Sequence, residues 1–186
     1  MITFVLVKDN SYVAVLGIFS ALLHELGHLL AMQIKGSFVS EIDFGLVNID
    51  ILDDTLKGES YDKNQLFVLL SGAAFNFIVA ALMLLIYFLS RVNIFKIFGI
   101  QNFIVGTLNL FPISQLDGGR ILFILISKKL DIVLADKILK IISIVFLLPI
   151  IVLGFIILVK SRYNFSLLIL GCYLLSYILF RDKSYI

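Results

Sequence analysis

The stretch ALLHELGHLL, residues 21–30, places both histidines of the chain and a glutamate inside an apolar run long enough to cross a bilayer. Ionisable groups are costly at membrane depth, so those found there usually serve a function. His24 and His28 are four residues apart and project from the same face of a helix, as two ligands of one metal ion must. Imidazole nitrogens suit zinc, and we expect one Zn²⁺ per chain. The alternative is a pair of core histidines hydrogen-bonded to a glutamate.

Glu25 lies between these histidines, three residues before His28. At that spacing its carboxylate can lie beside the ion without binding it. There it would take a proton from the attacking water and later pass it to the leaving amine. Zinc lowers the pKa of bound water to about 7, which supplies hydroxide at neutral pH. The motif therefore predicts that Glu25 is the catalytic base.

The composition places the whole chain in a membrane, because 61% of its residues are hydrophobic and its mean hydropathy is +1.09. A net charge of +2, with scattered basic residues, excludes a nucleic-acid partner. The pattern predicts a mainly α, polytopic protein with about five transmembrane or partly spanning helices. The apolar stretches are Tyr12–Ile34, Leu66–Ser90, Phe95–Pro112, Ile138–Val159 and Phe165–Phe180, of which the third and fifth are short for a spanning helix.

The long polar segment after the first stretch shows the alternation of a β-strand over Phe38–Leu46. A second strand after Leu46 and a third at Ile2–Val7 would complete a small membrane-associated β-sheet. A substrate must unwind to expose its peptide bond, and adding it to a sheet edge would satisfy its backbone groups. We therefore expect Phe38, Ile42 and Phe44 to help bind substrate; a purely structural sheet is the alternative.

A catalytic zinc of this kind usually has a third protein ligand. No histidine remains, and apart from Glu25, already assigned as the base, every acidic residue except Asp117 lies in or beside a polar loop. Asp117 follows Pro112, which would end the third stretch, and Asn109, which offers a polar group at membrane depth. The sequence favours Asp117 as the third ligand, and the alternative is an Asx turn leading into a helix at Arg120–Ile126.

The second stretch contains SGAAFN, residues 71–76, whose small residues let helices approach closely. Asn76 can hydrogen-bond to the substrate backbone or to the oxyanion, or it can only hold two helices together. Both interpretations stay open from the sequence.

Orientation follows from the basic residues, with nine on one side of the predicted membrane region and five on the other. The richer side is expected in the cytoplasm, and the polar cluster at Asn109–Asp117 would open the active site toward it. The nine residues are Lys35, Lys57, Lys63, Lys128, Lys129, Lys137, Lys140, Arg181 and Lys183, and the five are Lys8, Arg91, Lys96, Lys160 and Arg162.

Taken together, HELGH, the Gly72–Asn76 segment, Asn109-x-x-Pro112 and LDGG at 116–119 resemble the site-2 protease family of intramembrane zinc metalloproteases. The run LDGGRILFILISKKL is most similar to the membrane part of the bacterial branch containing stage IV sporulation protein FB. The resemblance implies His24, His28 and Asp117 as zinc ligands and Glu25 as catalytic base.

No internal repeat, low-complexity tract or linker divides the chain, so we expect one protease domain over 1–186, with its core motifs within 13–127 and accessory transmembrane helices at 138–180. The resemblance implies a multi-pass protein of the bacterial cell membrane that cleaves membrane-embedded or membrane-associated proteins in regulated intramembrane proteolysis. A regulatory membrane protein is a further expected partner, beside the lipid bilayer.

Two other function classes remain from the sequence. A membrane protease of the type that trims prenylated proteins would need a glutamate ligand on a later helix, but no Glu follows Glu59. A catalytically silent membrane scaffold of the same family is the other alternative, and the intact Glu25 argues against it.

The predicted strand can be tested with a proline at an outward-facing position such as Glu41. Proline removes a ladder donor, so cleavage should be impaired while zinc content stays normal. The measurement is cleavage rate and zinc stoichiometry in the purified variant. Normal cleavage with intact zinc in several such variants would make the segment merely structural.

Overall fold

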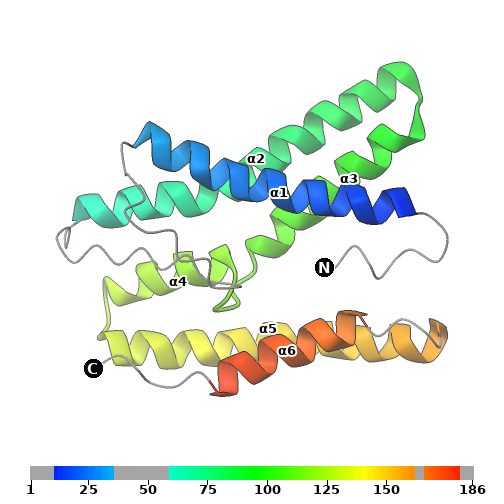
Figure 1. The fold of residues 1–186 in the computed structure, drawn as a ribbon. Helices are drawn as coiled ribbons and strands as arrows, with labels where there is room; N and C mark the ends of the chain where they lie inside the picture. The colour runs from blue at the N-terminus through cyan, green and yellow to red at the C-terminus, as the bar shows by residue number, and fades with distance from the viewer. Residues whose placement is uncertain (1–10, 36–58, 162–165, 181–186) are drawn as a thin grey trace. The chain divides into compact units, whose positions relative to one another are not determined.

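The computed structural model describes residues 11–35, 59–161 and 166–180, and within these ranges all regular structure is helical. The helices are α1 (Ser11–Ile34), α2 (Glu59–Ser90), α3 (Asn93–Asn109), α4 (Asp117–Ser127), α5 (Ile132–Ser161) and α6 (Ser166–Phe180), drawn in Figure 1. The mainly α prediction is confirmed. The expected strands at 2–7 and 38–46, with Phe38, Ile42 and Phe44, lie outside the described residues, so the β-sheet stays a prediction.

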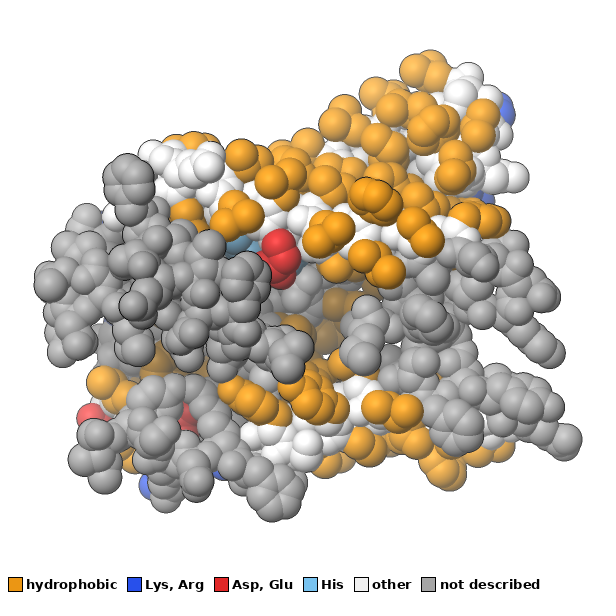
Figure 2. Space-filling view, viewed as in Figure 1, with side chains coloured by type: hydrophobic (Ala, Val, Ile, Leu, Met, Phe, Trp, Pro, Cys, Tyr) orange, Lys and Arg blue, Asp and Glu red, His pale blue; other side chains and the backbone are white. Residues whose placement is uncertain are grey.

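Three described helices are long and apolar enough to cross a membrane: α1 over Val15–Ile34, α2 over Lys63–Ser90 and α5 over Ile132–Lys160. The short third and fifth stretches of the sequence correspond to α3 and α6. Hydrophobic side chains cover much of the described surface in the space-filling view (Figure 2). Exposed leucines, isoleucines and phenylalanines along all three long helices fit contact with lipid and not with water.

The chain divides into two compact units, and one of them spans Ile18–Leu110. Within this unit α2 and α3 form an antiparallel helical hairpin, joined at a tight turn where Arg91 has a φ of 59° (Figure 1). Gly99 and Gly106 are two helical turns apart on α3 and face α2. A Cβ at Gly106 would come within 3.2 Å of the Ala73 carbonyl oxygen, so the two backbones lie close.

The other unit consists of Met1–Gly17 and Phe111–Ile186. In its described part α5 packs against both α4 and α6. Its core is a cluster of Ile113, Leu147, Leu174 and Ile178, which belong to the loop before α4, to α5 and to α6. At Gly171 a Cβ would meet Ile151 Cγ1 at 2.7 Å, so this glycine lets α6 approach α5.

The boundaries of two spans differ from the apolar stretches. α2 begins at Glu59, before the predicted Leu66, and α5 begins at Ile132, before the predicted Ile138. The added turns carry charged residues such as Lys63 and Lys137, which a hydropathy pattern excludes although a helix accommodates them at a membrane surface. α4 starts at Asp117, three residues before the helix expected at Arg120.

Candidate metal centre

One face of α1 is buried and lined by small and polar residues. Ser20, His24 and His28 are four residues apart along this face and all three are buried, whereas Leu22 and Leu29 on other faces are exposed. This inverts the pattern of a water-soluble amphipathic helix. In a bilayer the apolar side chains face lipid and the polar ones must face protein.

The two histidine rings meet at the centre of that buried face. Their Nε2 atoms lie 3.1 Å apart, the ring centroids are 4.7 Å apart, and the rings are nearly perpendicular at 88°. His24 is 4% exposed and His28 is 6% exposed, so both side chains are buried. The expectation that the i, i+4 spacing brings both imidazoles together is confirmed.

The main chain of α2 fixes the tautomer of His28. Its Nδ1 lies 2.8 Å from the Val68 carbonyl oxygen, and a carbonyl can only accept, so Nδ1 carries the hydrogen and donates it. In the neutral ring Nε2 then bears a lone pair. An imidazole that donates from one nitrogen and offers the other is the usual form of a metal-binding histidine.

Glycine at position 72 makes room for these rings. A Cβ there would lie 2.5 Å from His28 Nε2 and 2.8 Å from His24 Cε1. A Cβ at Gly27 would likewise meet the Ser71 carbonyl oxygen at 2.8 Å. The two glycines thus let α1 and α2 cross closely, and the Ser71 hydroxyl, 3.0 Å from the Gly27 carbonyl oxygen, adds a polar contact at the crossing.

The geometry of the pair fits a zinc ion. Two nitrogens bound to one tetrahedral zinc at about 2.0–2.1 Å would be about 3.3 Å apart, close to the 3.1 Å between the Nε2 atoms. Two neutral imidazoles, by contrast, would not hold their lone pairs together without a hydrogen or a cation between them. The donor set and its spacing are therefore compatible with a metal centre.

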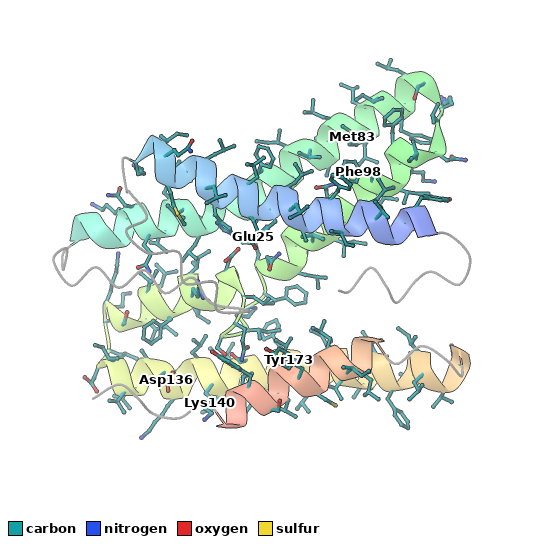
Figure 3. The ribbon with its side chains drawn as sticks, in the orientation of Figure 1. Glu25, Met83, Phe98, Asp136, Lys140 and Tyr173 are labelled. Carbon is teal, nitrogen blue, oxygen red and sulfur yellow. The ribbon has the colours of Figure 1, made fainter. Side chains whose placement is uncertain are left out.

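Glu25 projects from the middle of α1 in Figure 3 and is exposed, unlike His24 and His28, which are buried. Glu25 follows His24 directly and precedes His28 by three residues, so its carboxylate starts from the same turn of α1 as the buried pair but lies on an exposed face.

Asp117, in the other unit, is the first residue of α4 and is half-buried. The helix is preceded by Leu116 in an extended conformation, so Asp117 is its first residue and not its cap. Gly119 presses its backbone against the loop, because a Cβ there would clash with the carbonyl of Ile113. The Leu-Asp-Gly-Gly sequence therefore allows the chain to fold back tightly where it presents the carboxylate.

The two asparagines have different surroundings. Asn76 is completely buried on α2, close to Gly106 of α3, and neither amide atom has a hydrogen-bond partner among the described residues. Asn109 is partly buried near the end of α3, and its Nδ2 donates to the Val105 carbonyl oxygen at 3.1 Å. Its Oδ1 can still accept. The interpretation of Asn76 as interhelical glue finds no bond to support it among these residues.

Sequence reasoning missed the direct roles of Val68 and Gly72. Every residue has a main-chain carbonyl, so the sequence could not indicate that the Val68 carbonyl accepts from His28. Gly72 was noted as a small residue of SGAAFN and as part of the Gly72–Asn76 segment, but its closeness to the rings depends on how α1 and α2 cross.

Comparison with known proteins finds a match to one family model over part of the chain and one similar fold. Residues 89–153 match the model of peptidase family M50. This match runs from the end of α2 into α5, so it includes Asp117 and leaves out the histidines. The chain also shares its fold with a site-2 protease from Methanocaldococcus jannaschii, with a TM-score of 0.69 and 21% identity, over 100% of this chain and 85% of that one. No curated protein sequence matches.

The role of Gly72 gives a direct test of the histidine pair. Gly72→Ala should push the rings apart and lower zinc affinity by about 10-fold or more, the usual effect of disturbing the groups that orient metal ligands. Gly99→Ala is the matched control at a helix crossing without a histidine, since its Cβ would meet the Leu84 side chain at 2.9 Å and the Ala80 carbonyl oxygen at 3.2 Å. Zinc stoichiometry after mild chelation is the measurement. Equal zinc retention in both variants would contradict the assigned role.

Proposed function

We propose that this protein is an intramembrane zinc metalloprotease that hydrolyses peptide bonds of membrane-embedded or membrane-associated proteins. The observation that carries the proposal is the buried His24–His28 pair, with Nε2 atoms 3.1 Å apart on a candidate membrane span. The peptidase family match and the site-2 protease fold support the same reaction. That the whole chain works as one protease domain is part of the proposal.

His24, His28 and Asp117 are the proposed ligands of one zinc ion. The two histidines lie together on α1, and Asp117, in the other unit, joins them on the sequence argument that it is the remaining carboxylate in an apolar setting besides Glu25. Two imidazoles and a carboxylate are a frequent ligand set of catalytic zinc, which keeps a fourth position for water or substrate. The carboxylate also balances part of the charge of a divalent ion in an apolar setting.

Bound zinc would supply a water of lowered pKa and would polarise the scissile carbonyl. Glu25 would accept the proton from that water as its oxygen attacks the carbonyl carbon. When the carbon–nitrogen bond breaks, Glu25 would return the proton to the departing amine. Both products then leave with normal valences, and Glu25 is regenerated as a carboxylate.

Asn76 and Asn109 are the proposed partners of the substrate. An amide can donate to the developing oxyanion or hydrogen-bond to an extended substrate backbone. The segment containing Phe38, Ile42 and Phe44 is proposed to pair with the unwound substrate as an added strand.

The finer assignments rest on sequence pattern. The run LDGGRILFILISKKL supports the bacterial branch that contains stage IV sporulation protein FB. The excess of basic residues near Lys63, Lys128 and Lys137 supports a cytoplasmic opening of the active site in a multi-pass protein of the bacterial cell membrane. Regulated intramembrane proteolysis and control by a second membrane protein are proposed on the family resemblance alone.

The contrast between Glu25→Gln and Asp117→Asn tests the proposal. Glu25→Gln should lower cleavage by about 10²- to 10⁴-fold and retain one zinc per chain, because this carboxylate moves protons and does not hold the metal. Asp117→Asn keeps the shape but loses the charge that balances the ion, so it should weaken zinc binding as well as activity.

The measurements are zinc stoichiometry after mild chelation and cleavage of co-expressed candidate membrane substrates. If the Asp117 variant holds zinc as firmly as the Glu25 variant, a different third ligand must be sought. Normal zinc content without any cleavage in the native protein would favour the silent scaffold.

A further inference from the structure

The loop that leads from α3 into α4 is fastened to α5 by a buried hydroxyl. The Ser114 backbone N–H donates to Ser143 Oγ at 2.9 Å, and the Ser143 hydroxyl donates to the Leu139 carbonyl oxygen at 2.7 Å. Ser143 is 0% exposed. A hydroxyl carries one hydrogen and two lone pairs, so donating within its own helix leaves it able to accept from the loop.

A second attachment lies next to the first. Ile113 is completely buried and packs in the cluster with Leu147 of α5 and with Leu174 and Ile178 of α6. Leu147 follows Ser143 by four residues, so the same face of α5 holds the loop by one hydrogen bond and one apolar contact.

The loop in turn determines where α4 begins. Leu116 N–H donates to the Ile113 carbonyl oxygen at 2.8 Å, and the Gly119 and Arg120 N–H groups donate to the Leu116 carbonyl oxygen at 3.0 and 3.1 Å. The Gly119 backbone also presses on Ile113, where even a Cβ would not fit. The first turn of α4, which starts at Asp117, therefore cannot shift without moving residues 113–116.

We propose that Ser143 is a positioning residue for Asp117, holding the loop so that the carboxylate is preset for zinc. The proposal rests on the proposed function, since the position of Asp117 matters only if Asp117 binds the metal. It gives α5, expected from the sequence to be an accessory helix, a direct part in the metal centre.

The bilayer makes this hydroxyl hard to replace. Ser143 lies within the candidate span of α5 and is completely buried, so a side chain without a hydroxyl at this position would offer the Ser114 N–H no acceptor. Without the hydroxyl, Ser114 would lose its acceptor and the loop would sample other positions. Ligands that are not preset bind metal less tightly, by about 10- to 100-fold when their supporting contacts are removed.

The test compares Ser143→Val with Ser143→Thr, two nearly isosteric variants of which only the second keeps the hydroxyl. Zinc affinity is measured by competition with a chelator in the full-length purified protein, and amide hydrogen exchange of residues 110–119 is measured after zinc removal. Ser143→Val should lose zinc affinity by about 10-fold or more and exchange faster in the loop, whereas Ser143→Thr should stay near the native protein.

Ser176→Ala is the control, because among the described residues the exposed Ser176 hydroxyl bonds to the Tyr173 carbonyl of its own helix, at 2.8 Å. This variant should change neither the zinc affinity nor the amide hydrogen exchange of residues 110–119. Equal zinc affinity in the Ser143→Val and Ser143→Thr variants, or weakened zinc with unchanged loop exchange, would overturn the proposal.

Failure of the proposed function is recognised separately. If Asp117→Asn leaves zinc binding intact, the ligand set is wrong and Ser143 cannot act through Asp117. Loop exchange in the zinc-free Ser143→Val protein then reports only whether the loop is anchored, independently of any cleavage.

Discussion

The close crossing of α1 and α2 is the constraint on which the candidate centre depends. Two imidazoles can remain at membrane depth only if a neighbouring helix covers them and satisfies their polar atoms. Gly27 and Gly72 allow that approach, and the Val68 carbonyl accepts from His28 Nδ1 once the helices are in contact. A larger residue at either glycine would separate the backbones and expose the rings to lipid.

The same crossing shows why small residues recur in this protein. Lipid is as apolar as leucine, so burying leucine between helices gains little in a membrane. Close backbone approach gains dispersion and polar contacts instead, and Gly99 and Gly106 provide it between α2 and α3. The large apolar side chains can then face outward, as Leu22 does on α1.

The features that could be predicted from the sequence are those that depend on the local periodicity of a helix. The spacing of His24 and His28 required only that residues 21–30 be helical, and so the meeting of the two rings could be foreseen. Contacts between distant segments could not be foreseen. Val68 and Gly72 contact the rings because α1 and α2 cross there, and no local sequence pattern specifies that crossing. The start of α2 at Glu59 was missed for a different reason: its first turns are polar and continue the helix beyond the apolar stretch. The strand around Phe38 stays a prediction.

Each unit has a serine on a membrane helix whose hydroxyl holds the backbone near a proposed zinc ligand. A serine hydroxyl that bonds to its own preceding turn costs little in lipid, because its hydrogen is already paired. Ser71 bonds to the Val68 carbonyl at 2.5 Å, the same oxygen that receives the hydrogen of His28, and Ser143 bonds to Leu139 while accepting from Ser114. Each hydroxyl thus stiffens a backbone segment beside a proposed zinc ligand without introducing a charge. A chain that must keep a polar centre in an apolar solvent can in this way orient its ligands with neutral hydroxyl groups whose hydrogens have acceptors even when no metal is bound.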